Sequence, residues 1–146
     1  MNTNKPLFFF LIFFLTFTAV KGQAKYQEKI LGIYRSPNKK SKIEFVEKDG
    51  LYQGILIWNV NPNIKDKFNS NKELQTKNLV GQTIFKNLKY NKYDRSWTGK
   101  FYDTESGSTY DCNLWFEYNK NNLMARGYID NPIIGQTKVL KRIVEE

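Results

Sequence analysis

Few side chains in this 146-residue chain could carry out covalent or acid–base chemistry, because it contains no histidine and only one cysteine, Cys112. Without histidine there is no Ser–His–Asp triad and no imidazole to act as a general base or metal ligand. A single thiol cannot form an internal disulfide or a multi-cysteine metal site. Cys112 alternates with the apolar Tyr110 and Leu114, so we expect an inert thiol in the core rather than a redox or nucleophilic cysteine.

Three carboxylates, Asp103, Glu105 and Asp111, are close enough in sequence to suggest the acid pair of a glycosidase. Asp103 and Glu105 fall in a polar turn, where aspartate commonly accepts hydrogen bonds from nearby backbone. Asp111 belongs to the polar face of its strand. We interpret all three as structural. The sequence thus predicts a protein that is not an enzyme and has neither a metal site nor a cofactor.

Aromatic side chains offer a binding site instead. Alternation in the strands predicts that Tyr52, Trp58 and Tyr110 point inward. Such rings form either a packed core or the wall of a cavity, and an aromatic cavity with a few polar groups is the usual kind of small-molecule site. These three residues are our candidates for contacting a small apolar or amphipathic ligand.

A second cluster, formed by Trp115, Arg126 and Tyr128, is predicted on the outer face of two neighbouring strands. One hypothesis is that this face binds a partner, such as another component of the cell envelope. In that case the domain would be a β-barrel with a filled core that acts as an interaction module. The other hypothesis is that the arginine only stacks on the aromatic rings and stabilises the fold.

The chain has 23 Lys and Arg against 14 Asp and Glu, a net charge of +9. Its lysines are scattered and no nucleic-acid-binding motif accompanies them, so we do not expect a nucleic-acid partner. Charge alone favours a general attraction to anionic surfaces.

Residues 1–22 have the pattern of a signal peptide: an early lysine, an apolar stretch over 7–20, and small residues at the end. We expect cleavage before Gln23 or, alternatively, after Ala24. Fourteen apolar residues are fewer than the roughly 20 that span a bilayer, so no stable transmembrane anchor should remain. The sequence predicts an exported protein, periplasmic or secreted, with residues 23–146 as one domain.

The remainder of the chain alternates apolar and polar residues with the period of a β-strand. Asp49-Gly50 is a strong signal for a two-residue hairpin turn. Eight short strands separated mostly by tight turns predict an antiparallel meander, and closure into a barrel would remove its exposed edges. The expected strands are 30–36, 41–48, 51–59, 82–90, 95–102, 108–118, 123–130 and 136–144.

The segment 60–81 is the one long irregular piece. A structureless loop of this length is uncommon in a compact domain. Ser70, with Glu73 three residues later, forms a capping-box pattern that predicts a short helix over about 71–77. The segment could cap one end of the barrel, either as a fixed plug or as a moving lid.

Several ordered motifs resemble a known family, and together they cover about residues 30–143. The most specific runs from Trp97-x-Gly99 through Tyr102-Asp103 to Cys112-x-Leu114. These motifs are similar to the bacterial domain of unknown function 2147, a family of small exported proteins without an established activity. The other motifs are Lys42-Ile43-Glu44, Gly50 to Trp58, Asp66-x-x-Asn69 with Leu74 and Leu79-x-Gly81, Arg126 to Ile129, and Ile134-Gly135-x-Thr137.

The resemblance implies a lipocalin-like (calycin) barrel. The calycin pattern places Gly-x-Trp in the first strand and an arginine in the last, whereas this chain has Gly32-Ile33-Tyr34 with Arg142 as the partner that could stack on the tyrosine. The central loop departs from the family pattern, with Gln75 and Lys77 in place of two arginines. Gln136 likewise stands where an arginine is common. Any anion-binding role of those arginines is therefore not expected here.

Overall fold

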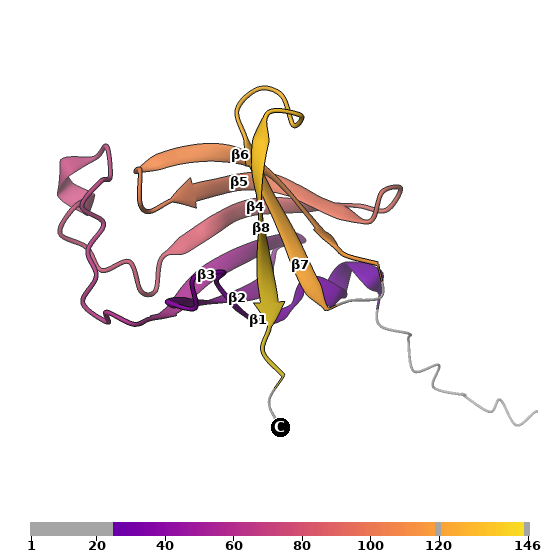
Figure 1. Cartoon of the computed structure of the whole chain (residues 1–146), viewed down its shortest axis with the longest axis horizontal. Coiled ribbons are helices and arrows are strands. Elements are labelled where there is room, and N and C mark those ends of the chain that lie inside the picture. Colours follow the sequence, from indigo (N-terminus) through magenta and orange to yellow (C-terminus); the bar gives the residue numbers. More distant parts are fainter. Residues whose placement is uncertain (1–24, 119–120, 145–146) are drawn as a thin grey trace, which may run out of the picture.

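The computed structural model describes residues 25–118 and 121–144. The expected signal peptide and its cleavage sites lie outside the described residues. Eight antiparallel strands follow one another around a closed barrel in sequence order, and β1 pairs with β8 to complete it (Figure 1). The strands are β1 (Gly32–Arg35), β2 (Ser41–Lys48), β3 (Leu51–Asn59), β4 (Thr83–Asn91), β5 (Ser96–Asp103), β6 (Ser108–Phe116), β7 (Asn122–Tyr128) and β8 (Gly135–Arg142).

The predicted eight-stranded antiparallel barrel is confirmed. The hairpin between β2 and β3 shows how turn residues in the sequence determine the pairing of two strands. Asp49 and Gly50 have positive φ angles of 55° and 77°, the backbone that the tightest right-twisted hairpin turns require. Lys48 consequently faces Leu51 across the turn, and the remaining register of the two strands follows from it.

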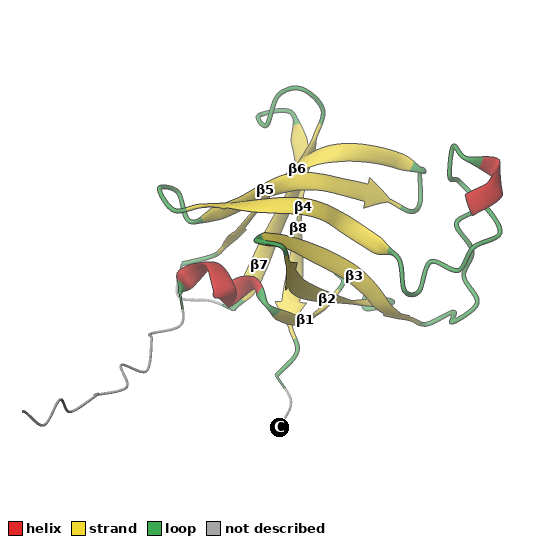
Figure 2. Cartoon of the chain, turned by 180° about the vertical axis from the view of Figure 1, so that it is seen from behind, coloured by secondary structure: helices red, strands yellow, loops and turns green. Residues whose placement is uncertain are grey.

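Helix is almost absent from the described residues. Two short 3-10 turns, η1 (Tyr26–Ile30) and η2 (Lys72–Leu74), lie on opposite sides of the barrel (Figure 2). Neither is long enough to cross a membrane. The sequence predicted a strand beginning at residue 30, but Ile30 ends η1 and is fully buried.

The helix predicted over 71–77 is only the three-residue turn η2, and its cap is not Ser70. Asn71 is the N-cap residue, and its side-chain oxygen accepts a 3.0 Å hydrogen bond from the backbone N–H of Glu73. The segment 60–81 is held mainly by side-chain and backbone hydrogen bonds, such as Gln75 Nε2 to the carbonyl oxygen of Asn69 at 2.8 Å. These bonds replace the longer helix that the capping pattern predicted.

Arg142 closes one end of the barrel. Its guanidinium lies 4.7 Å from the centre of the Tyr34 ring and donates hydrogen bonds to the carbonyl oxygens of Leu31 and Lys29 and to the Tyr34 hydroxyl. The stacking of arginine on tyrosine expected from the calycin pattern is therefore present. Because β1 and β8 share only two residue pairs, these side-chain contacts reinforce the shortest seam of the barrel.

Large rings fill the closed half of the barrel. Trp97 is fully buried, and its ring centre lies 6.2 Å from that of Tyr26 in η1 and 5.8 Å from that of Phe116. Gly54 leaves space for Phe85, since a Cβ there would lie 2.8 Å from the Phe85 ring. All eight strands of the closed barrel lie within 25–144, and so does the core cluster that the described residues form.

Candidate functional site

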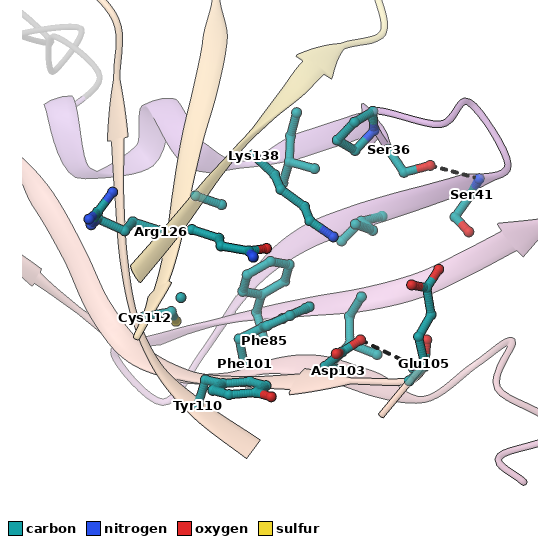
Figure 3. A pocket seen from close by; sticks show the side chains of 18 of the residues that line it. Ser36, Ser41, Phe85, Phe101, Asp103, Glu105, Tyr110, Cys112, Arg126 and Lys138 are labelled. Carbon is teal, nitrogen blue, oxygen red and sulfur yellow. Dashed lines mark hydrogen bonds between the residues drawn. The ribbon is translucent and has the colours of Figure 1, made fainter. Parts of the chain in front are cut away.

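The open half of the barrel contains a cavity of about 620 Å³, in the size range of small-molecule sites. Its floor is apolar, because inward-facing residues of seven strands, β2 to β8, meet there. Figure 3 shows the rings of Phe85, Phe101 and Tyr110 gathered on one side of this space. The floor residues are Ile43, Leu56, Phe85, Phe101, Cys112, Ala125 and Leu140.

The mouth of the cavity is polar. Lys138 extends from β8 over the aromatic floor, and Glu105 lies on the facing side, in the turn between β5 and β6 (Figure 3). Asn59 donates a 2.8 Å hydrogen bond to Ser41 between β3 and β2, and both residues line the cavity. The arrangement suits a molecule with an apolar body and a polar head.

Cys112 is buried in the floor of the cavity, as the expectation of an inert core thiol requires. Burial raises the pKa of its thiol to about 12. The reactive thiolate is therefore almost absent at neutral pH, and the residue acts as a small apolar wall element.

The three candidate ligand residues lie in three different places. Tyr110 lines the cavity. Tyr52 points inward but is buried in the closed half, its ring centre 6.4 Å from that of Trp97 and outside the cavity lining. Tyr52 adjoins the Asp49–Gly50 turn, and this hairpin is at the closed end of the barrel.

The expectation that Trp58 faces the interior is wrong. Its side chain is 43% exposed, and the ammonium of Lys42 lies 5.5 Å from the ring centre. The reason is a β-bulge: Ile43 faces Leu56 but Lys42 faces Trp58, so Ile57 is an extra residue on β3. One extra residue reverses the side on which each later side chain lies. The bulge turns Trp58 outward and Asn59 into the mouth.

The outer cluster does not form one aromatic–arginine patch. Across β6 and β7, Trp115 faces Met124, Arg126 faces Asn113, and Tyr128 faces Asp111. The Arg126 guanidinium binds the loop between β7 and β8, where it donates to the carbonyl oxygens of Pro132 (2.6 Å) and Ile133 (2.8 Å). It also donates to the hydroxyl of Thr137 in β8 (2.8 Å). Arg126 thus positions a loop at the open end.

Two of the three carboxylates, Asp103 and Asp111, have structural contacts. Asp103 accepts hydrogen bonds from the backbone N–H of Glu105 (3.1 Å) and the hydroxyl of Ser106 (2.8 Å), the turn role that the sequence predicted. Asp111 forms a 2.7 Å ion pair with Lys100 on the surface, which raises the pKa of that lysine. Among the described residues, no group of three or more acidic, cysteine or histidine side chains is placed to hold a metal ion.

The segment 60–81 lies beside the cavity and contributes Ile64 and Leu79 to its wall. Asp66 in this segment is fully buried, and its carboxylate accepts hydrogen bonds from the Tyr102 hydroxyl (2.5 Å) and the Asn69 amide (2.7 Å). Burial, and then the bond to Asp66, raise the pKa of Tyr102 to about 12. These bonds attach the segment to β5.

The sequence pattern does not single out the lysine at the mouth. Lys138 is one of the many lysines scattered along the chain. Its position was nevertheless readable, because Gln136 and Lys138 share the inward face of β8 with buried Leu140. Gln136 and Lys138 are exposed only because the barrel is open at that end. The signal that identifies such residues is a polar side chain at an alternating position of a strand whose other inward positions are apolar.

A closed eight-stranded barrel with one plugged end and a cavity at the other defines a lipocalin-like protein. The chain is similar to the solved structure of protein HP1028 from Helicobacter pylori, whose description assigns it to the lipocalin family. The two are 27% identical, the match covers 80% of this chain and 84% of that one, and the TM-score is 0.69. A search of the curated proteins finds no match to this sequence.

Residues 32–142 match the family of uncharacterized proteins conserved in bacteria known as DUF2147. The chain belongs to this family, which confirms the resemblance seen in its motifs.

Proposed function

We propose that this protein is a non-enzymatic binding module that holds one small amphipathic molecule in the cavity at its open end. The observation that carries the proposal is the cavity itself: about 620 Å³ with an apolar floor and a polar mouth, in a barrel whose other half is filled with rings. A lipocalin-like fold supports the same role. The apolar body of the ligand would lie on Phe85, Phe101 and Tyr110, with its polar head near Lys138 and Gln136.

The proposal can be tested by filling the cavity. Ala125 is buried in the floor, while its neighbour Met124 is half-buried on the outer face of β7. Ala125→Phe should abolish the fluorescence increase of N-phenyl-1-naphthylamine, an apolar probe of suitable size, and Met124→Phe should leave it unchanged. Equal probe binding by both variants, each confirmed as folded by circular dichroism, would show that the probe does not use this cavity.

The alternative, a filled-core interaction module using Trp115, Arg126 and Tyr128, has less support. The core is only half filled, and the Arg126 nitrogens are engaged by the β7–β8 loop and by Thr137 of β8. We therefore favour the ligand-binding function.

We also propose that the protein is exported to the periplasm or the medium, on the basis of the signal-peptide pattern in residues 1–22. The intact mass of the protein from fractionated cells tests this. A chain beginning at Gln23 or Lys25 in the periplasmic or extracellular fraction is the expected result. A chain that retains residues 1–22, in the cytoplasmic fraction, would contradict it.

A further inference from the structure

Three isoleucines in the loop between β7 and β8 are exposed to solvent. The exposed fractions are 65% for Ile129, 83% for Ile133 and 77% for Ile134. Figure 1 shows this loop projecting beyond the neighbouring strands β5 and β6. A cluster of large aliphatic side chains at a projecting tip marks an interaction site more often than isolated apolar residues do.

The loop is held in this exposed shape. Arg126 donates to the carbonyl oxygens of Pro132 and Ile133, and the Asn131 side-chain oxygen accepts a 2.9 Å hydrogen bond from the Ile133 N–H. The Ile134 N–H donates in turn to the carbonyl oxygen of Asn131 at 3.0 Å. Hydrogen bonds that fix a loop with its isoleucines in water favour a role for those side chains outside the fold itself.

The tip is continuous with the cavity. On the β7–β8 side of the otherwise polar mouth, Ile129 and Ile134 line the cavity, so apolar side chains on that side lie between the floor and the outside of the barrel. An amphipathic molecule leaving an apolar medium in contact with the tip would reach the floor without crossing open water.

The charge of the loops around the mouth indicates which kind of apolar medium the tip would contact. The chain has a net charge of +9, and the four loops at the open end, 36–40, 60–82, 104–107 and 129–134, contain six lysines and four acidic residues. One of those acids, Asp66, is buried and bonded to Tyr102. The exposed charge around the mouth is therefore mainly positive, which favours approach to an anionic surface.

We propose that the open end of the barrel docks on an anionic lipid bilayer, with Ile133 and Ile134 inserted among the lipids and the cavity mouth facing the membrane. A bilayer fits better than a protein partner. The tip is aliphatic, whereas the centres of protein interfaces are rich in tyrosine, tryptophan and arginine. The one arginine beside the tip is committed to the loop.

Vesicle flotation tests the proposal, using the chain from Gln23 because the apolar stretch 7–20 would itself bind lipid. All eight strands of the closed barrel lie within this chain, so we expect the protein to retain its fold. It should float with phosphatidylcholine vesicles that contain phosphatidylglycerol, and more weakly with phosphatidylcholine alone. Ile133→Ser with Ile134→Ser should reduce its affinity for the anionic vesicles by on the order of tenfold or more.

Tyr93→Ser is the matched control, since Tyr93 is an equally exposed apolar residue in the turn between β4 and β5, at the closed end. It should leave flotation unchanged. The proposal would be overturned if Tyr93→Ser and the double serine variant lost flotation equally, or if the unmodified chain did not float with anionic vesicles. A dimer, seen in sedimentation without lipid, that the two serine substitutions abolish would also overturn it, because the tip would then bind a second copy. Ile133→Ser alone, at a residue outside the cavity lining, should also weaken flotation but leave the binding of N-phenyl-1-naphthylamine unchanged, which keeps this result separate from the function of the cavity.

Discussion

The hydroxyl of Tyr102 in β5 lies 2.5 Å from the carboxylate of Asp66, a fully buried acid in the segment 60–81. This bond attaches the longest irregular segment of the chain to the barrel wall. The same region has a close backbone contact: Gly107 has a positive φ of 72°, and a Cβ there would overlap the carbonyl oxygen of Phe68. The segment is thus fitted to the turn between β5 and β6 as well as bonded to β5.

Tyr102→Phe should destabilise the protein by about 1–3 kcal/mol, because it removes one partner of a buried carboxylate. It should also speed hydrogen exchange in 60–81 relative to the strands. Tyr93→Phe removes a hydroxyl from a residue that is 88% exposed, and should change neither quantity. If both variants melt and exchange alike, the bond does not hold the segment in place. Slow exchange of 60–81 in the unmodified protein favours a fixed plug over a moving lid.

Arg142→Lys should destabilise the barrel by roughly 2 kcal/mol or more. Lysine cannot reproduce the planar fork that binds the carbonyl oxygens of Leu31 and Lys29 while stacking on Tyr34. Arg35→Lys, at an exposed site on β1, is the matched control and should be nearly neutral. Urea unfolding measures both. Similar midpoints for the two variants would contradict the closing role of Arg142.

Alkaline pH should destabilise the protein through Cys112. The folded thiol has a pKa of about 12 against an ordinary value of 9.0, so above pH 9 the unfolded chain releases a proton that the folded chain retains. Stability is unaffected by this group below pH 9 and falls as the pH rises towards 12, by about 1 kcal/mol near pH 10. Burial raises the tyrosine pKa values at Tyr34 and Tyr52 in the same direction. Urea unfolding at pH 7 and near pH 10 should show that Cys112→Ala loses less of its free energy of unfolding between the two pH values than the unmodified protein does. An equal loss would mean that the thiol ionises freely in the folded protein.

Lys138→Met should weaken binding of an anionic amphiphile such as laurate by roughly three- to tenfold, because the ammonium faces the space above the aromatic floor. Binding of the uncharged N-phenyl-1-naphthylamine should not change. Lys141→Met, an exposed lysine of the same strand outside the cavity lining, serves as the control. Isothermal titration can compare the three proteins. Laurate affinities that do not differ would place the polar head elsewhere in the mouth.

The fold was largely predictable from the sequence because its signals are local. Alternation and turn residues such as Asp49-Gly50 set the strands, and an exposed edge favours closure. The pairing of Tyr34 with Arg142 followed from the family resemblance. The helix over 71–77 was overpredicted because Asn71 competes with Ser70 for the same capping role, which the capping pattern alone does not resolve.

The site was less predictable because it depends on position along the barrel axis. Alternation tells which face a residue occupies, but not whether its inward side chain lies in the filled or the hollow half. Tyr52 and Tyr110 both point inward, yet only Tyr110 reaches the cavity. The bulge at Ile57 left no recognisable pattern, and it alone turned Trp58 outward.

Native mass spectrometry of the protein purified from its own host tests the central claim most directly. If the cavity holds a ligand, the unmodified protein should carry a bound species of a few hundred daltons in reproducible amount, as a site of this size permits. Ala125→Phe, purified in the same way, should have the mass of the chain alone, and Met124→Phe should retain the species. A bound species that persists in Ala125→Phe would contradict a ligand-binding function for the cavity. So would the mass of the chain alone in all three preparations, if the protein also fails to bind N-phenyl-1-naphthylamine.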